Sequence, residues 1–421
     1  MNWIRVTRPE RGMRMEKSGR KGPMHGIVIV ELASHAFVPS CCACLADWGA
    51  RVIKLEQHPF GDPSRAVISS GLIPLMDVNY YWEWCNRGKE SFGIDMKKEG
   101  AKEVAYELIG KADIFATNLR RSSLAKLGLD AKSLFKINSK LVIARATGFG
   151  DKGPESENPG FDFAAFWARS GIADTFSEPG RPVLTQPPAV GDFISGLYLA
   201  AGVAAALCAR YGTGKGQEVS LSLLAAGIYS SALSAQFSLA SGIEAQKIPR
   251  EKVPNPLWNS YQTSDGRWIQ LAMLETEQYW DGFCNAVGIT DLKTDVRFNS
   301  HMRRTENNIS LISILDKVFA SKPFKEWVAA LGKSRLIWAP FQKAYEVFDD
   351  VQVLANEYVD TVADADYKMK KFITTPIQFN GKPTKVNRPA PTVGQHTEEV
   401  LVEMGWDWDN ILRLKEKGTI I

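Results

Sequence analysis

The stretch Gly26–Leu32, with the sequence GIVIVEL, decides the fold class of this chain. It is an almost continuous apolar run, which is typical of a strand that is buried on both faces of a parallel sheet. A helix is predicted to follow over Pro39–Trp48, and a second strand over Arg51–Leu55, with the sequence RVIKL. Together these segments form one βαβ unit of about 30 residues.

The same alternation of strand and helix continues along the chain. Further strands are predicted at Ser91–Asp95, Asp113–Thr117 and Leu141–Thr147, with an amphipathic helix at Glu99–Lys111 and a helix that begins at Ser122–Leu127. Regular alternation of this kind indicates parallel strands with helices on both faces of the sheet. The sequence therefore predicts an α/β fold with a Rossmann-like large domain.

The later elements suggest a second, smaller domain of the α+β class. In chain order we predict a strand at Gln217–Leu223, a long helix at Ala225–Ser241, a strand at Trp268–Met273, helices at Thr276–Val287, Ile309–Phe319 and Phe324–Leu331, strands within Lys371–Phe379 and a closing helix at Glu398–Glu403. Prolines between the long helix and the next strand mark a boundary, since proline interrupts both kinds of element.

These patterns divide the chain into four segments. Residues 1–24 form a basic leader that is predicted to be flexible, and they lack the apolar stretch of a signal peptide. Residues 25–225 form the large α/β domain, and residues 226–350 form a linker helix with the small α+β domain. Residues 351–421 are predicted to return and complete the large domain.

Composition and charge limit the classes of partner. The 421 residues include 51 Lys and Arg against 47 Asp and Glu, so no strong field favours nucleic acid or a membrane surface as a partner. The longest apolar stretch, Leu197–Ala209, is shorter than the roughly 20 residues of a membrane-spanning helix. Six cysteines fit free thiols in a reducing compartment. We therefore expect a cytoplasmic protein with no nucleic-acid or membrane partner.

Cys41, Cys42 and Cys44 resemble a metal-binding cluster at first sight. Neighbouring cysteines do not readily face one ion, and no Cys-x-x-Cys pair with a distant partner exists in the sequence. The five histidines are scattered singly along the sequence. The sequence therefore predicts no metal site, and these cysteines are expected to pack a helix against the sheet.

A carboxylate is the best candidate for a catalytic group. No Ser-His-Asp order or Cys-His pair stands out, and the motif GxSxG is absent. The Gly191-Asp192 pair lies between a proline-rich segment and a strongly apolar helix, where an aspartate is often an ordinary helix cap. In a dry pocket beside a thioester, a carboxylate is also a competent nucleophile. The residues alone leave four candidates open, namely Asp192, Asp162, Asp62 and Glu56.

Several cationic and amide side chains follow the predicted strands. Asn118, Arg120 and Arg121 come directly after one strand, Lys97 follows another, and Lys126 lies one helical turn further on. Each of these alone is more commonly a solvated surface residue. Because ligands of α/β proteins bind at the carboxyl ends of the strands, their shared position favours a common anionic, phosphate-bearing ligand.

One segment has the glycine spacing of the dinucleotide-binding fingerprint but lacks the helix that should follow it. Gly148, Gly150 and Gly153 have the G-x-G-x-x-G spacing directly after a predicted strand. The third glycine should open a helix whose N-terminus holds the pyrophosphate, but Pro154 and a polar loop follow it instead. A bending loop that lets the backbone approach a ligand is the better interpretation.

The motifs, taken in order, resemble those of the class III (formyl-CoA transferase-like, CaiB/BaiF-type) CoA-transferases. The likeness extends from about Gly26 to Thr397. Its motifs are Gly49–Glu56, Gly61–Arg65, Asn86–Lys89 with Ser91, Asp113-Ile114 with Asn118, Pro159–Asp162, Gly191-Asp192 and Thr213–Gly216. Asn255–Leu257, Asp265–Leu271 and Gly160–Gly171 are most similar to the branch that handles 2-hydroxy acids from amino-acid fermentation. That branch includes phenyllactate and 2-hydroxyisocaproate CoA-transferases.

This resemblance implies an activity and an assembly. CoA would move from an acyl-CoA, such as cinnamoyl-CoA or a similar enoyl-CoA, to an aryl or branched 2-hydroxy acid such as (R)-phenyllactate. Asp192 would be the nucleophile and would carry an aspartyl mixed anhydride and then an aspartyl-CoA thioester. Coenzyme A would enter as the acyl-CoA co-substrate, with no permanently bound cofactor. The large domain would bind CoA, and two chains would form an interlocked, ring-like homodimer.

The resemblance also implies the residues that contact CoA. They are Ala36, Phe37, Gln57, Lys97, Asn118, Arg120, Lys126, Asn158, Phe161 and Asp162. A glutamine that helps to hold the acyl group in some members aligns with Ala36, and an arginine near the adenine aligns with Gln57. Backbone N–H groups are therefore expected to stabilise the oxyanion.

Aromatic residues near these motifs suggest an apolar pocket for the acyl group. They are Phe37, Phe161, Phe163, Phe166 and Trp167. Packing into the domain core is an equally good interpretation for Phe163 and Phe166.

Three alternatives to this activity are weighed. α-Methylacyl-CoA racemases resemble the same scaffold, but they place a proton-carrying histidine where this chain has Phe161, and a phenyl ring carries no proton. A transferase for a dicarboxylate or a carnitine-type acid is a second alternative. A dicarboxylate would need an arginine for its second carboxylate, and the sequence offers no spare arginine beside Asp192. A non-catalytic CoA-binding protein is the third, against which the presence of Asp192 argues.

Overall fold

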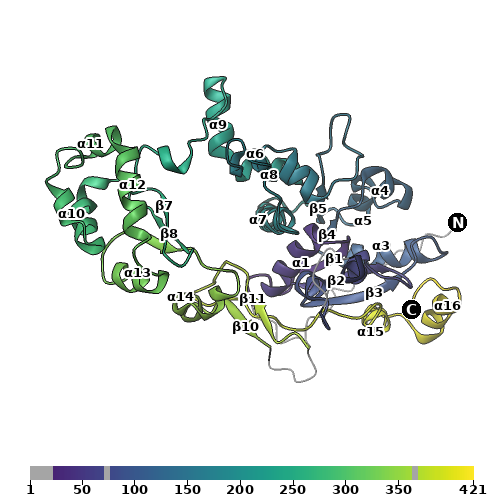
Figure 1. Ribbon diagram of the computed structural model, residues 1–421. Helices are drawn as coiled ribbons and strands as arrows, with labels where there is room; N and C mark the ends of the chain where they lie inside the picture. The colour runs from purple at the N-terminus through teal and green to yellow at the C-terminus, as the bar shows by residue number, and fades with distance from the viewer. Residues whose placement is uncertain (1–21, 71–75, 363–367) are drawn as a thin grey trace. The chain divides into compact units, whose positions relative to one another are not determined.

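The computed structural model describes residues 22–70, 76–362 and 368–421, and these divide into two compact units (Figure 1). The large unit contains residues 22–176, 184–240 and 354–421, apart from the undescribed positions, and the small unit contains residues 177–183 and 241–353. Each unit has a hydrophobic core of its own.

A six-stranded parallel sheet forms the centre of the large unit, as the alternation of strand and helix predicts. Its strands are β1 (Val28–Leu32), β2 (Arg51–Gln57), β3 (Lys89–Ile94), β4 (Ile114–Thr117), β5 (Val142–Thr147) and β6 (Glu218–Ser222). They lie in the order β3-β2-β1-β4-β5-β6, and every neighbouring pair is parallel. The α/β prediction is confirmed. From β1 the strands are first added on one side of the sheet, as β2 and β3, and then on the other side, as β4, β5 and β6. Ligands of such folds bind at the point between β1 and β4 where this order changes.

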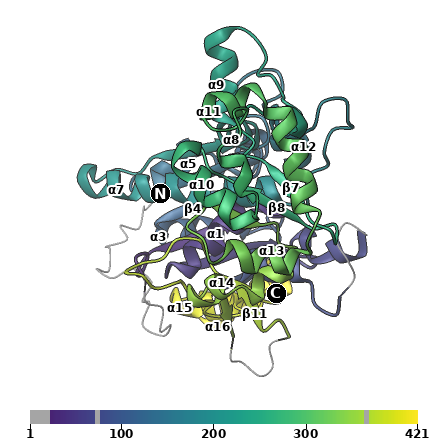
Figure 2. The same ribbon diagram turned by 60° about the vertical axis from the view of Figure 1, so that its left-hand side comes forward.

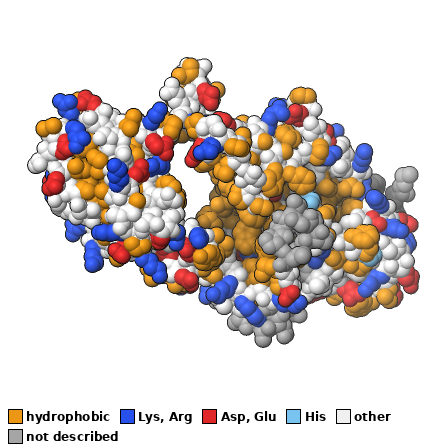
Figure 3. All heavy atoms as spheres, in the orientation of Figure 1, with side chains coloured by type: hydrophobic (Ala, Val, Ile, Leu, Met, Phe, Trp, Pro, Cys, Tyr) orange, Lys and Arg blue, Asp and Glu red, His pale blue; other side chains and the backbone are white. Residues whose placement is uncertain are grey.

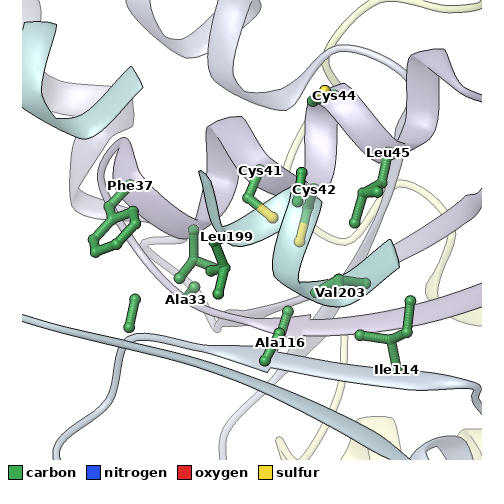
Figure 4. Close-up of a cluster of buried hydrophobic side chains, with 14 of the residues drawn as sticks. Ala33, Phe37, Cys41, Cys42, Cys44, Leu45, Ile114, Ala116, Leu199 and Val203 are labelled. Carbon is green, nitrogen blue, oxygen red and sulfur yellow. The ribbon is translucent and has the colours of Figure 1, made fainter. Parts of the chain in front are cut away.

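The two faces of the sheet bury alternate residues of the same strands. On one face Ile29 packs against α1 (Phe37–Asp47) and α7 (Val190–Thr213), where Cys41 and Cys42 meet Leu199 and Val203 (Figure 4). On the other face Val28 and Val30 pack against α3 (Ala101–Lys111). The buried cysteines are thus core residues, as expected, and the apolar run in β1 is explained by burial on both sides.

The C-terminal segment returns to the large unit. Its elements are α14 (Val351–Ala355), β10 (Val359–Thr361), β11 (Lys371–Ile373), α15 (Thr397–Glu403) and α16 (Trp408–Glu416). Val400 of α15 and Ile411 of α16 join the core on the α3 face of the sheet (Figures 1 and 2). The predicted strand from Lys371 ends at Ile373, and α16 was not predicted from the sequence.

Helix α7 is longer than the apolar stretch Leu197–Ala209 indicated, with 24 residues. By length and composition alone, one helix of the described chain could cross a membrane, or two if the bent pair α8 and α9 is counted as a span. Core helices of soluble proteins pass the same test, and Leu199 and Val203 of α7 lie in the core beside α1.

The predicted long helix Ala225–Ser241 is wrong in one respect. It consists of α8 (Leu223–Ser230) and α9 (Ala232–Ser241), which are bent by 80° relative to each other. Helix α8 begins where the Ser222 hydroxyl accepts the N–H of Ala225.

Short helices connect the strands of the large unit. They are the 3₁₀ helix η1 (Pro63–Ser70), α2 (Tyr80–Asn86), α4 (Arg121–Leu127), α5 (Ala131–Ile137), the π-helix η2 (Phe163–Ala168) and α6 (Ile172–Phe176).

The small unit combines an antiparallel sheet with helices. Its elements are η3 (Arg250–Lys252), β7 (Ser260–Gln262), β8 (Trp268–Leu271), α10 (Thr276–Val287), η4 (Thr290–Lys293), α11 (His301–Glu306), α12 (Asn308–Phe319), α13 (Phe324–Leu331), β9 (Trp338–Pro340) and η5 (Glu346–Asp349). The rings of Tyr261, Phe319 and Trp327 stack in its core, with centroid distances of 5.0 and 4.9 Å. The three helices predicted in this region are present at the predicted positions.

Candidate active site

Asp192 lies in the first turn of α7, where the chain leaves a proline-rich segment. The residue before it has no room for a side chain, because a Cβ atom at Gly191 would lie 2.6 Å from the Phe166 ring. Ala189 has a φ of 61°, a left-handed conformation that is uncommon for residues other than glycine and is often found at functional sites. The end of α7 is therefore held against the core, and Asp192 is only 8% exposed.

The Asp192 carboxylate is unusually isolated for a buried acid. Within the described chain it forms no hydrogen bond and no ion pair. Burial, and then the nearby charge of Asp162, raise the pKa of Asp192 well above its usual value. Once ionised, a carboxylate with so little stabilisation is a reactive nucleophile toward an activated carbonyl carbon.

Asp162 is surrounded by hydrogen-bond donors instead. Its Oδ2 accepts from Nε2 of Gln186 at 2.5 Å, and its Oδ1 accepts from the N–H of Phe163 at 2.9 Å. The backbone N–H groups of Gly191 and Asp192 also donate to it. Burial outweighs these donors and raises the pKa of Asp162. Asp162 thus caps the N-terminal end of α7 and fixes the turn that carries Asp192.

The other two candidate carboxylates are neutralised by cations. Glu56 accepts two hydrogen bonds from Arg65, at 2.6 and 2.9 Å, and one from Ser91 at 2.6 Å. Asp62 lies 2.9 Å from Nζ of Lys54. Burial alone would raise the pKa of Asp62, but Lys54 and the hydrogen bonds of Asp62 lower it to about 2. Neither carboxylate is available in this arrangement to attack a substrate.

Lys54 belongs to a fully buried cluster of charges that sequence reasoning missed. Its Nζ lies 2.7 Å from Oε1 of Glu31, and the other oxygen of Glu31 lies 2.7 Å from Nζ of Lys89. Lys54 also donates to the carbonyl oxygen of Ala33 at 2.7 Å. The local signals were charged residues within predicted strands, Glu31 in β1 and Lys54 in β2, with Lys89 at the start of β3. The cluster holds the loop between β1 and α1 in place.

That loop forms one wall of the site at the switch point of the sheet. Ser34 and Asn118 exchange two hydrogen bonds, at 3.1 and 2.8 Å, which join the ends of β1 and β4. His35 has a φ of 64°, and its N–H donates to Asp62 at 3.2 Å. The His35 ring meets Phe161 edge-on at 5.4 Å. The wall is therefore fixed from both sides before any ligand binds.

A pocket opens between the loops that follow β1, β4 and β5, all within the large unit. Its volume is about 210 Å³, and Asp192 lies on its wall. The predicted residues that line it are Phe37, Asn118, Arg120, Asn158 and Phe161. Basic and amide side chains thus surround one opening, with the isolated carboxylate beside them.

Comparison with known proteins agrees with this geometry. A model of CoA-transferase family III matches residues 24–397, nearly the whole chain. The chain belongs to this family. It is similar to the (R)-2-hydroxy-4-methylpentanoate CoA-transferase of Clostridioides difficile, at 32% identity over 94% of this chain and 99% of that protein. It is equally similar to the cinnamoyl-CoA:phenyllactate CoA-transferase of Clostridium sporogenes, at 32% identity over 94% of this chain and 97% of that protein.

A solved structure shows the same fold. The crystal structure of a CaiB/BaiF family protein from Brucella suis aligns with a TM-score of 0.79 and 29% identity, over 91% of this chain and all of that chain. The protein is therefore a class III CoA-transferase, and its co-substrate is a CoA thioester. The family and the enzyme class predicted from the sequence are confirmed.

Five of the predicted CoA contacts do not line the pocket of this CoA-transferase, and one of them is Asp162, which accepts the N–H groups of the first turn of α7. Ala36 is fully buried at the start of α1. Gln57 donates to the carbonyl oxygen of His58 at 2.9 Å, while Lys97 and Lys126 are exposed on the surface of the large unit. Contact of these five residues with CoA stays a prediction.

Arg145 is a pocket residue that was not predicted. It is 2% exposed in the middle of β5, and its Nε donates to Glu218 at 2.7 Å. Arg145 also pairs with Asp151, and Arg121 reaches the same two carboxylates at 3.0 and 3.2 Å. An arginine inside an apolar strand was the available signal. These pairs tie the loop after β5 to the sheet.

The aromatic residues expected around the acyl group separate into three environments. Phe37 and Phe161 line the pocket, whereas Phe166 is fully buried in the core. Trp167 donates to the carbonyl oxygen of Leu184 at 2.8 Å, and Phe163 is exposed. Only the first two lie where a ligand in this pocket would meet them.

No group of His, Cys, Asp and Glu suitable for a metal ion occurs among the residues that the structure describes. Five of the six cysteines are buried, and Cys208 is exposed. The family indicates no permanently bound cofactor for this CoA-transferase.

Proposed function

We propose that this CoA-transferase moves CoA from an acyl-CoA, such as cinnamoyl-CoA or a similar enoyl-CoA, to an aryl or branched 2-hydroxy acid such as (R)-phenyllactate. Asp192 is the nucleophile. The observation that carries this proposal is its isolation: Asp192 is the buried carboxylate at the pocket that lacks a partner, whereas Glu56 and Asp62 are paired and Asp162 caps a helix. The substrate class is supported by the names of the two similar transferases.

The reaction would proceed by exchange at activated carbonyl groups. The Asp192 carboxylate attacks the thioester carbonyl, the C–S bond breaks, CoA leaves as a thiolate, and the acyl group stays on Asp192 as a mixed anhydride. The thiolate then attacks the Asp192 carbonyl of the anhydride, which releases the donor acid and leaves an aspartyl-CoA thioester. The acceptor carboxylate attacks that thioester, and the thiolate returns to the new acyl group. Each step replaces one activated carbonyl by another, so no energy source is needed.

The site favours these steps by position and by exclusion of water. Groups held in the correct orientation reach effective molarities of roughly 10⁵–10⁸ M. The burial of Asp192 limits hydrolysis of the anhydride. Asp192 also lies at the N-terminal end of α7, where the helix dipole favours developing negative charge. In this proposal the oxyanion donors are backbone N–H groups other than those of Gly191 and Asp192, which donate to Asp162.

CoA would lie across the pocket at the ends of β1, β4 and β5. We propose Arg120, Lys97 and Lys126 as partners of its phosphates, since cationic side chains donate charge-assisted hydrogen bonds to phosphate. The other proposed contacts are Ala36, Phe37, Gln57, Asn118, Asn158, Phe161 and Asp162.

Short dicarboxylates would be poor acceptors. Of the three pocket arginines, Arg121 and Arg145 pair with Asp151 and Glu218, and we assign Arg120 to the phosphates of CoA. A panel of acids assayed against one acyl-CoA donor tests this choice. Faster transfer to oxalate, succinate or carnitine than to phenyllactate and isocaproate-type acids would refute the substrate class but not the transferase activity.

We propose that two chains form an interlocked, ring-like homodimer in the cytoplasm. Its segments are those of the sequence analysis: residues 25–225 and 351–421 in the large domain, and 226–350 in the linker and small domain. Exposed apolar side chains support association, because Leu233 and Leu239 of α9 are 88% and 79% exposed. Hydrophobic side chains cover much of the large unit on the side seen in Figure 3.

The nucleophile is tested by Asp192→Asn, which keeps the shape of the side chain but removes its charge. We expect transfer to be abolished while acyl-CoA still binds, as measured by calorimetry. Hydroxylamine added during turnover should convert acylated or thioesterified Asp192 into a hydroxamate of shifted mass. Near-normal transfer by the variant would refute the assignment.

A further inference from the structure

Helix α2 presents two hydrogen-bond donors without acceptors. Tyr81 and Trp84 are three residues apart, so their side chains lie on the same face of the helix. Nε1 of Trp84 is buried and has no hydrogen-bond partner. The Tyr81 hydroxyl also makes no hydrogen bond with any described residue. Buried donors are nearly always paired in native proteins, so the unpaired indole N–H of Trp84, on the same helix face as the Tyr81 hydroxyl, requires an explanation.

Both side chains pack close to the turn that carries Asp192. Tyr81 and Trp84 pack with Phe193 around a small buried cluster that consists of Ala36, Cys85 and Ala189. The ring centroids of Trp84 and Phe193 are 4.3 Å apart, and Phe193 directly follows the nucleophile. Ala189 lies three residues before it. The face of α2 is therefore in contact with the turn that carries Asp192.

The two donors remain donors throughout the working pH range. An indole N–H only donates. Burial, and then the negative charges near it, hold the pKa of Tyr81 well above its usual value, so the hydroxyl stays protonated. A group that enters this cluster must supply an oxygen acceptor if both donors are to be satisfied.

The α2 side of Asp192 is distinct from the pocket side. Asp192 lines the pocket with Arg120 and Asn158, but Tyr81, Trp84 and Phe193 do not. The polar, basic side of Asp192 would therefore face one substrate. The apolar, aromatic side, which carries the two donors, remains for the other substrate.

We propose that Tyr81 and Trp84 form the subsite for the free acid and donate hydrogen bonds to its 2-hydroxyl oxygen, with Phe193 packed against its apolar side chain. This inference rests on the proposed function, since it assumes that a 2-hydroxy acid is the acceptor. It adds what the motifs do not specify, namely how the enzyme would distinguish such an acid from one without the hydroxyl.

The test compares two acids on single-donor variants of the full-length enzyme. Tyr81→Phe and Trp84→Phe each remove one donor and keep an aromatic ring. We expect kcat/KM for phenyllactate to fall about tenfold in each variant, and that for 3-phenylpropanoate, which lacks the 2-hydroxyl, to stay within about twofold. The KM for acyl-CoA should not change.

Trp406→Phe is the matched control. Its indole N–H donates to Glu107 at 2.8 Å, away from Asp192, so this variant should treat the two acids as the wild type does. An equal loss for both acids in Trp84→Phe and Tyr81→Phe would indicate a structural role and overturn the inference. No loss for either acid would overturn it as well. If the wild-type enzyme transfers CoA equally well to both acids, this subsite is refuted but the proposed transferase activity is not. Transfer by Asp192→Asn would refute only the assignment of Asp192 as the nucleophile.

Discussion

Lys54→Met should destabilise the enzyme more than any change to a surface charge. Lys54 has no exposed side-chain surface, and its Nζ lies 2.7 Å from Glu31 and 2.9 Å from Asp62. Burial lowers the pKa of a lysine, but Asp62 and Glu31 raise that of Lys54 above its usual value, so the ammonium is charged at all working pH values. Methionine keeps the length of the chain and removes the charge.

The expected loss follows from what remains after the change. Among the described residues, Asp62 would lose its only ion-pair partner, and Glu31 would keep Lys89 alone. Breaking a buried pair from one side costs about 3–5 kcal/mol, because the other charge stays buried without compensation. The carbonyl oxygen of Ala33 would also lose its donor, so the loop between β1 and α1 should loosen and transfer should slow.

Lys111→Met provides the control, since Lys111 pairs with Glu107 at the surface at 2.9 Å and both side chains are 37% exposed. Exposed pairs of this spacing contribute only about 0.3–0.5 kcal/mol. Denaturant unfolding, followed by fluorescence and circular dichroism, measures both variants. A loss below about 1 kcal/mol for Lys54→Met, or equal losses for the two variants, would refute the role given to the buried cluster.

Three further predictions concern the site. Replacing Lys97 and Lys126 by methionine should raise the KM for acyl-CoA and leave that for the free acid nearly unchanged, as steady-state kinetics would show; equal effects would contradict the proposed contacts. Asp192→Asn should stabilise the fold near neutral pH, because the raised pKa of Asp192 means that folding opposes ionisation of this carboxyl group. Well below the usual pKa of an aspartate the carboxyl group is protonated in both the folded and the unfolded state, so the stabilisation should disappear. Unfolding curves at the two pH values test the sign. Gly191→Ala should cost about 1–3 kcal/mol and reduce transfer, since its Cβ would meet the Phe166 ring; unchanged thermal unfolding would refute this.

The strands and the nucleophile candidate could be predicted because their signals are local. The run GIVIVEL identifies a strand that is buried on both faces, whatever its neighbours are. Helix α16 also had local signals, since Asp407 caps it and apolar residues recur with helical spacing, and it could have been predicted from them. The break between α8 and α9 had no comparable signal.

The pairing of charges could not be predicted, because it depends on the tertiary fold. Glu31, Lys54 and Lys89 come from three different strands and meet only when β1, β2 and β3 lie side by side. The same holds for Arg145, whose partner Glu218 is 73 residues away in the sequence. Sequence motifs indicated which carboxylates deserved consideration, but not which of them a cation would neutralise.

The distribution of charge explains why one carboxylate, among four candidates, suits nucleophilic attack. Asp62 has a pKa near 2 because Lys54 and Ser64 stabilise its charge, so it is permanently ionised and poorly reactive. Asp192 has the opposite environment: burial raises its pKa, and no cation or donor from the described part of the chain stabilises the charged form. Environments that push the pKa values of neighbouring acids apart assign different roles to them. By this argument, a cation placed beside Asp192 would lower its pKa and weaken it as a nucleophile, even though it would make the ionised form more abundant.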